Sequence, residues 1–228
     1  MRFSFVQQVS MLLCAVACVG FASCADAEPD IVSATGSVVF DYATDESLPA
    51  SRLAVFVQTE SEVQRVSSIQ IVSKETGYRW NITAPNMLKS GDKQWACYTN
   101  LLPPEHERIP MGLYEFQYTD ATGEEAESTF TVSYSEKLLD TTSGNVRSVI
   151  TSAKEESVAL YDKNNVLIYF GKRKNNWSSN ANILRDYNTA FTVRHCIAAD
   201  SNRVVCLLPA EYLIEQPKEE SDAGEQDE

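Results

Sequence analysis

The 228-residue sequence predicts a mainly β fold, in which a β-sandwich is followed by a small, hairpin-rich α+β unit. The clearest sign is a long hairpin over residues 112–134, where aromatic and polar residues alternate with the period of a half-buried strand. A turn-forming segment, 120–123, divides this hairpin. No helical period interrupts residues 36–134, and the pattern changes after them. The sandwich is therefore assigned to 36–134 and the second unit to 135–216.

Seven strands are predicted in the sandwich, at the spacing typical of two packed sheets. They cover residues 37–42, 52–59, 67–74, 78–83, 94–100, 113–119 and 129–134. Apolar residues recur at every second position, as Val38, Phe40 and Tyr42 do in the first strand. Tyr114, at the head of the sixth strand, is placed to form a tyrosine corner, with its hydroxyl bonded to an upstream loop.

The second unit alternates helical and hairpin patterns. In chain order these are a helix over 146–153, a hairpin over 158–171, a short helix over 180–187 and a hairpin over 191–208. Ser143 or Asn145 is the N-cap of the first helix, and Asn164 and Asn165 form the first hairpin's turn because asparagine tolerates the left-handed region. This order predicts a small α+β unit. The alternative is that both hairpins extend one larger β structure.

The second hairpin contains two cysteines that one strand register brings together. If Cys196 faces Cys206, Ile197 pairs with Val205, the apolar residues share one face and both sulfurs share the other. The sequence therefore predicts a Cys196–Cys206 disulfide in an exported protein, worth on the order of 2–3 kcal/mol. Cys97 is then a buried thiol in the sandwich.

The N-terminus has the pattern of an export signal. Residues 9–23 are apolar but too short to span a bilayer, and they end at Cys24. The segment 21–24, Phe-Ala-Ser-Cys, resembles a bacterial lipobox. The resemblance implies that residues 1–23 are a lipoprotein signal peptide and that Cys24 carries the acyl chains, with 24–35 as a tether. Cleavage before Cys18 or after Ala27 remains open as an alternative.

The segment 112–123, Gly-x-Tyr-x-Phe-x-Tyr-x-Asp-x-x-Gly, and the order of the strands resemble bacterial immunoglobulin-like domains, which are related in shape to fibronectin type III. The resemblance implies an immunoglobulin-like sandwich over residues 36–134. It implies no catalytic residues, and it points to a spacer, a scaffold or a binding module.

The net charge of the chain argues against two classes of partner. The formal net charge is −13, and such a surface repels nucleic acid and anionic lipid headgroups. In the last twelve residues, 217–228, one lysine stands against six acidic residues with no large apolar residue, which predicts a disordered acidic tail.

Few residues have a pattern that points to catalysis. The chain has two histidines. His106 lies in a polar loop without the spacing of a metal site, and His195 is expected in a strand as a core histidine. A nucleophilic pair of Cys97 with a histidine would need an orienting group and an oxyanion hole, which no motif marks. No cofactor, metal site or enzymatic activity is therefore predicted.

A cluster of positive charge at the end of the first hairpin is a candidate contact surface for an acidic partner or a glycan. The alternative is that these charges only prevent the strand edge from pairing with another chain. It consists of Lys172, Arg173, Lys174 and Trp177. Together the patterns predict a non-enzymatic lipoprotein, anchored to a membrane of a bacterial cell envelope on its periplasmic or outer side. It would bind or scaffold an envelope protein or glycan. The alternatives are a surface adhesin for host matrix or glycan and, more distantly, a cysteine or histidine hydrolase.

Overall fold

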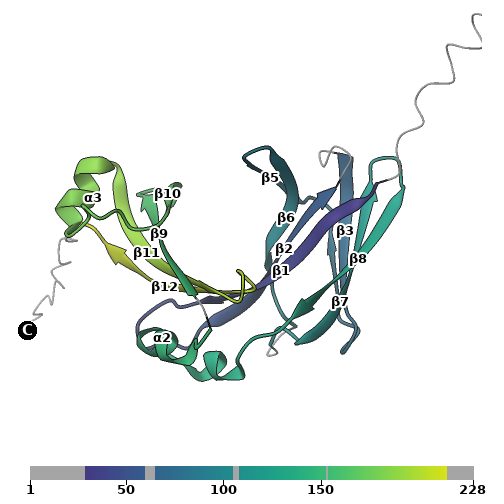
Figure 1. The fold of residues 1–228 in the computed structure, drawn as a ribbon, viewed down its shortest axis with the longest axis horizontal. Coiled ribbons are helices and arrows are strands. Elements are labelled where there is room, and N and C mark those ends of the chain that lie inside the picture. Colours follow the sequence, from purple (N-terminus) through teal and green to yellow (C-terminus); the bar gives the residue numbers. More distant parts are fainter. Residues whose placement is uncertain (1–28, 60–64, 105–107, 153, 215–228) are drawn as a thin grey trace, which may run out of the picture.

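The computed structural model describes residues 29–59, 65–104, 108–152 and 154–214. The fold is mainly β, with 55% of the described residues in strands and 11% in helices, as predicted. Two sheets form it, and Figure 1 shows that the larger one curls through the molecule like half of a barrel. None of the helices in the described residues is long and apolar enough to cross a membrane.

The larger sheet has eight strands in the order β10-β9-β11-β12-β1-β2-β6-β5, and the smaller has four in the order β4-β3-β7-β8. The strands from the first half of the chain are β1 (Ile31–Asp41), β2 (Ala50–Thr59), β3 (Val66–Ser73), β4 (Arg79–Ile82), β5 (Asn86–Ser90), β6 (Lys93–Leu101), β7 (Gly112–Asp120) and β8 (Glu125–Val132). The later strands are β9 (Lys154–Asp162), β10 (Leu167–Gly171), β11 (Ala190–Ala199) and β12 (Val204–Tyr212). The helices are η2 (Glu136–Asp140), η3 (Ser143–Asn145), α2 (Val146–Val149) and α3 (Asn180–Asp186).

The main core lies between the two sheets. In β1 the alternate residues Val38 and Phe40, and Tyr42 beyond them, are at most 1% exposed, because every second side chain of a strand points to the same face. Facing them from the smaller sheet are the alternate apolar residues of the predicted hairpin: Tyr114, Phe116, Tyr118, Phe130, Val132 and Tyr134. The tyrosine corner is confirmed: the hydroxyl of Tyr114 donates a hydrogen bond of 2.7 Å to the carbonyl of Pro110.

All seven predicted strands of the first range are present, and one strand, β5, was missed. Its Met87 and Leu88 are both 46% exposed, so no buried face gave the segment a period of two. The segment between 134 and β9 also differs from the prediction. The helix predicted over 146–153 is the single turn α2, and the backbone is extended at Ile150 (φ −79°, ψ 102°).

One pairing joins the later hairpins to the sandwich strands. β12 lies parallel to β1, with Val39 opposite Val205 and Phe40 opposite Cys206. The edge of β1 is therefore covered, and the eight-stranded sheet runs through both predicted ranges, 36–134 and 135–216. Both hairpins extend one larger β structure, which is the arrangement that the sequence had offered as the alternative.

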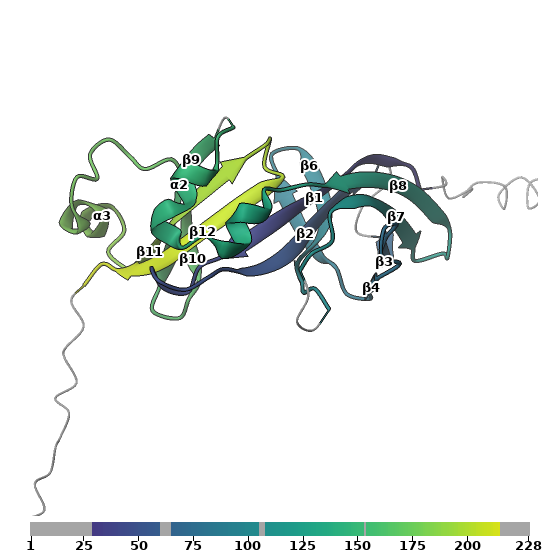
Figure 2. The same ribbon diagram turned by 90° about the horizontal axis from the view of Figure 1, so that it is seen from below.

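The helices cover the sheet on the side of the core. Figures 1 and 2 both show α2 beside β12, and Leu138 and Val146 belong to the same buried cluster as Cys206 and Leu208. A second, separate cluster lies at the far end, where α3 and Trp177 pack on Val158 and Leu160 of β9. These layers lie on the convex side of the curled sheet (Figure 1).

Candidate functional site

The concave face of the eight-stranded sheet is the main candidate site. Strand register places on it the residues that alternate with the core positions, such as Val39 opposite Val205 and Phe56 opposite Cys97. The apolar residues of this face are Val39, Ala54, Phe56, Leu88, Trp95, Cys97, Ala159, Phe170, Cys196, Ala198, Val205 and Leu207.

Exposure separates the two faces of the same strands. On the core side, Val55 and Val57 of β2 and Cys206 of β12 are all 0% exposed. On the concave side, their neighbours Phe56 and Val205 are only half-buried, and Phe170 at the β10 rim is 62% exposed. No described helix or strand covers this face in Figure 1. The sheet therefore presents an uncovered concave surface, on which Phe56, Trp95, Val205 and Leu207 are half-buried, Phe170 is exposed, and Val39, Ala54, Ala159 and Cys196 are buried.

A charged cluster lies in the middle of this surface. It consists of Asp41 on β1, Arg52 on β2 and Arg194 on β11. The Asp41 carboxylate accepts a hydrogen bond of 2.7 Å from each arginine, at Oδ2 from Arg52 and at Oδ1 from Arg194. The three side chains are 28%, 23% and 19% exposed. We call this group the arginine–aspartate cluster.

Backbone carbonyls hold both guanidinium groups in place. Arg52 Nε donates to the carbonyl of Thr99 at 3.0 Å, and Arg194 Nε donates to that of Leu208 at 2.8 Å. Arg194 lies at a shift in the β11–β12 register between residues 194 and 196, a bulge that brings it to these carbonyls. Within the described part of the chain, Arg52 Nη2 and Arg194 Nη1 have no hydrogen-bond partner.

Burial and the arginine–aspartate cluster together set the titration of the groups on this face. Burial raises the pKa of Asp41, but the hydrogen bonds from Arg194 and Arg52 outweigh burial and leave this pKa below its ordinary value of 3.8. Burial also raises the pKa of Tyr161, and raises that of Cys196 to about 11. The face therefore holds an ionised carboxylate, two guanidinium groups, a neutral phenol and a neutral thiol at pH 7.

Replacing Asp41 by asparagine should reveal this linkage as a pH-dependent loss of stability. We expect the free energy of unfolding at pH 7 to fall by about 1–2 kcal/mol, less than for a fully buried pair because the group is partly exposed. Because the folded pKa is lowered, the contribution is full above the unfolded pKa and disappears as the pH falls through the folded pKa. Urea titrations at pH 7 and pH 3 should therefore show a smaller difference between the two proteins at pH 3 than at pH 7.

The matched control is the exposed Asp140, which has no ion pair among the described residues. Asp140→Asn should leave the free energy of unfolding unchanged at both pH values. A loss for Asp41→Asn of the same size at pH 7 and pH 3 would contradict the titration of Asp41 between them.

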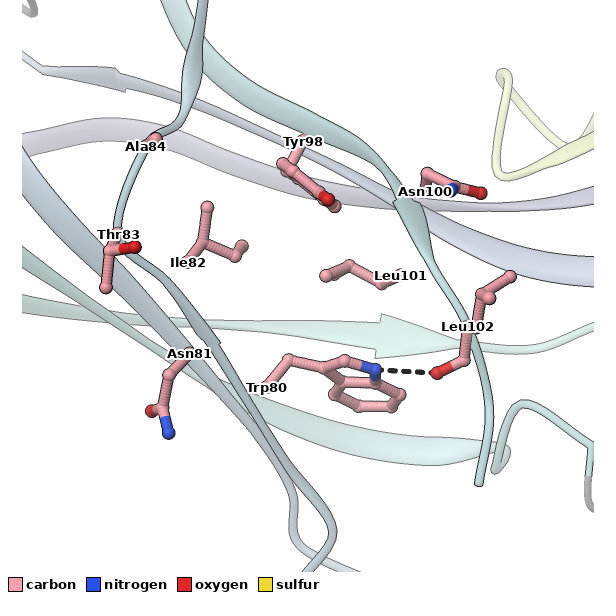
Figure 3. A pocket seen from close by; sticks show the side chains of 9 residues that line it. All are labelled: Trp80, Asn81, Ile82, Thr83, Ala84, Tyr98, Asn100, Leu101 and Leu102. Atoms are coloured by element: carbon pink, nitrogen blue, oxygen red, sulfur yellow. Dashed lines mark hydrogen bonds between the residues drawn. The ribbon is translucent and has the colours of Figure 1, made fainter. Parts of the chain in front are cut away.

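A first pocket opens between the edge strand β4 and the end of β6. It has a volume of about 440 Å³ and is lined by Trp80, Asn81, Ile82, Thr83, Ala84, Tyr98, Asn100, Leu101 and Leu102. Figure 3 shows the Trp80 ring at its base, with the indole Nε1 donating to the carbonyl of Leu102 at 2.8 Å. Trp80 is 8% exposed. It is a core residue and not an exposed aromatic platform.

A second pocket, of about 360 Å³, is lined by His195 and Glu211 together with Asp45, Ser143 and other residues. The hydroxyl of Ser143 is the nearest candidate for a nucleophile, but it donates a hydrogen bond of 2.8 Å to Asp45, and Ser143 is 3% exposed. His195 is half-buried and not a core residue. The described residues contain no group of three or more metal-ligating side chains.

Three residues of the predicted basic patch, Arg173, Lys174 and Trp177, pack in or against the second hydrophobic cluster. Trp177 is 2% exposed, and its Nε1 donates to Asp186 at 2.8 Å. Arg173 donates twice to the carbonyl of Trp177. Lys174 Nζ lies 5.0 Å from the centre of the Trp177 ring, and it also lies over Tyr169 and Tyr187. Lys172 is exposed. Contact with a partner through these residues stays a prediction.

The predicted Cys196–Cys206 disulfide is wrong. Cys196 lies opposite Leu207, and Cys206 lies opposite Ile197, so the two side chains point to opposite faces of the sheet. Both are buried free thiols, as Cys97 is. The register differs by one residue from the prediction because Asp200, Ser201 and Asn202 all take left-handed conformations (φ 52°, 58° and 67°), and the strands therefore close at Ala199 and Val204.

Three predicted features lie outside the described residues. They are the lipidation residue Cys24 with its signal peptide, His106, and the acidic tail from 217 to 228. The arginine–aspartate cluster, in contrast, was missed by sequence reasoning. Asp41 and Arg194 are 153 residues apart, and no motif links them. The sequence did contain one sign of the cluster. Asp41, Arg52 and Arg194 each stand among the apolar residues of a strand, where charged residues are uncommon.

No protein-family model matches this chain, and a search of curated proteins finds no match.

Proposed function

We propose that this protein is a non-enzymatic lipoprotein of the bacterial cell envelope, tethered through Cys24, that binds a ligand on the concave face of its large sheet. The observation that carries the proposal is the exposure of that face. Phe56, Trp95 and Leu207 are only half-buried, whereas Val55, Ala96 and Cys206, on the other side of the same strands, are 0% exposed. A soluble domain leaves so much apolar sheet uncovered chiefly where something binds.

We also propose that the sandwich strands form an immunoglobulin-like core. Their order supports it: β1-β2-β6-β5 matches the A-B-E-D sheet of constant-type immunoglobulin domains, and β3-β7-β8 matches C-F-G, with β4 added beside β3. The corner at Tyr114 falls on β7, the counterpart of strand F, where such domains carry it. In this arrangement β12 extends the sheet from strand A, and the concave face is built by that extension.

The tether is tested at Cys24. Cys24→Ser should move the protein from the membrane fraction to the soluble fraction of expressing cells, because two or three acyl chains anchor a protein stably and none remains. Globomycin, which blocks the lipoprotein signal peptidase, should cause the unprocessed precursor to accumulate. The matched control is Cys18→Ser, which should change neither result. A precursor processed normally under globomycin would contradict lipidation.

Binding at the concave face is tested by photo-crosslinking in the same cells. A benzophenone amino acid at position 207, on the concave face, should form an adduct that mass spectrometry detects. The same group at Leu113, which is 43% exposed on β7 of the smaller sheet, should not form that adduct. If both positions give the same adducts, or neither gives any, the concave face is not the binding surface. Proteolysis of intact cells then tells whether the protein lies on the outer surface.

A further inference from the structure

The arginine–aspartate cluster indicates the chemical class of the ligand that the concave face binds. We propose that this face binds a long-chain monocarboxylate, with its carboxylate at Arg52 and Arg194 and its acyl chain along the apolar residues toward one edge of the sheet. The proposal rests on the binding function proposed above and adds the chemical class of the ligand.

Charge complementarity is the first argument. Two guanidinium groups and one ionised carboxylate leave one positive charge at the centre of the face, in a chain whose net charge is −13. An acidic protein that places its surplus positive charge on an uncovered apolar surface favours an anion there. A single surplus charge matches a carboxylate better than a phosphate dianion, which would leave a negative charge against apolar side chains.

The hydrogen-bonding capacity of the cluster is the second argument. Asp41 and the backbone carbonyls use most of the arginine donors, yet Arg52 Nη2 and Arg194 Nη1 remain without partners in the described chain. Neither nitrogen is sealed from solvent. Because the carbonyls already fix both guanidinium groups, little side-chain entropy is lost when they bind, and charge-assisted bonds to a carboxylate are among the strongest available.

The apolar surroundings are the third argument. From β1 to the rim strand β5 there are three strand spacings, roughly 14 Å, and the face along this path carries Phe56, Trp95 and Leu88. Toward β10 there are four spacings, roughly 19 Å, with the half-buried Leu207 and the exposed Phe170 on the path. Either path is longer than a short organic acid and suits an extended acyl chain.

The test uses the full chain carrying Cys24→Ser, freed of copurified lipid, with calorimetric titration of dodecanoate below its micelle concentration. We expect one dodecanoate per chain, at least tenfold tighter than dodecyltrimethylammonium or dodecyl maltoside. Lengthening the acid should tighten binding by about two- to fourfold per added methylene. Arg52→Gln should weaken dodecanoate binding about tenfold or more, and Arg108→Gln, an equal charge change in an exposed pair with Glu136, should not change it.

The variant Asp41→Asn distinguishes an effect on ligand binding from an effect on the stability of the fold. It removes a negative charge beside both arginines, so it should tighten dodecanoate binding severalfold even though it destabilises the fold. Weaker binding in this variant, equal affinity for the cationic and anionic amphiphiles, or a dimer that forms through position 207 would overturn the carboxylate proposal. If dodecanoate does not bind while the adduct at position 207 persists in cells, the ligand class is wrong and the binding function stands. If both are absent, both proposals fall.

Discussion

Trp177→Ala is expected to lower the free energy of unfolding by about 3–5 kcal/mol, the range for removing a large buried aromatic side chain. Trp177 is the largest fully buried side chain of the chain's second hydrophobic cluster. Its ring makes edge contacts with Tyr169 and Tyr187 at centroid distances of 5.0 and 5.8 Å, and its Nε1 bonds to Asp186. Alanine would leave a cavity and remove the donor of that bond.

Urea titration followed by circular dichroism measures the loss. Trp177→Phe should lose less, because a smaller aromatic ring still fills part of the site, although the bond to Asp186 is absent. Phe170→Ala, at a position 62% exposed, is the control and should change the free energy by less than about 0.5 kcal/mol. Because the second cluster is separate from the main core, amide exchange should accelerate in β9, β10 and α3 but not in β7. A loss below about 1 kcal/mol would contradict the structural role of Trp177.

Gly36→Ala is expected to lower the free energy of unfolding by about 1–3 kcal/mol, because it overpacks the contact between the two sheets. A Cβ at position 36 of β1 would lie 2.6 Å from Cδ2 of Phe130 and closer still to Cε2 of the same ring. The ring cannot move aside freely, since Phe130 stacks on Tyr114 at a centroid distance of 5.3 Å. Glycine is required at position 36 for space and not for a left-handed backbone.

A double-mutant cycle checks this cause. Phe130→Ala removes the obstructing ring, so Gly36→Ala should cost little in the Phe130→Ala background, which gives a coupling energy of about 1 kcal/mol or more. Gly144→Ala is the control, because a Cβ at position 144 meets no atom within 4 Å. Equal costs for Gly36→Ala in the two backgrounds would show that Phe130 is not the obstacle.

The strands could be predicted where one face of the strand is buried and the other is exposed to solvent. β7 is the best example: Tyr114, Phe116 and Tyr118 are 0% exposed, and polar residues alternate with them. The same rule failed for β5, whose Met87 and Leu88 are both exposed at the rim. It also failed for the register of β11 and β12, because successive left-handed residues at Asp200 and Ser201 set the length of the turn, and residue types alone did not specify that conformation.

By itself, the sequence determined the local features of this protein: the period of each strand, the turns, the corner at Tyr114 and the mainly β class. Only the tertiary structure decided that β12 lies along β1, that Asp41 meets Arg52 and Arg194, and that the concave face, opposite the core, is left uncovered. The reason is physical. Alternation shows which side chains share a face, but the backbone groups of a strand edge are the same for every sequence. Which strand pairs with that edge is therefore settled by the packing of the whole chain, and the concave face exists only as a consequence of that pairing.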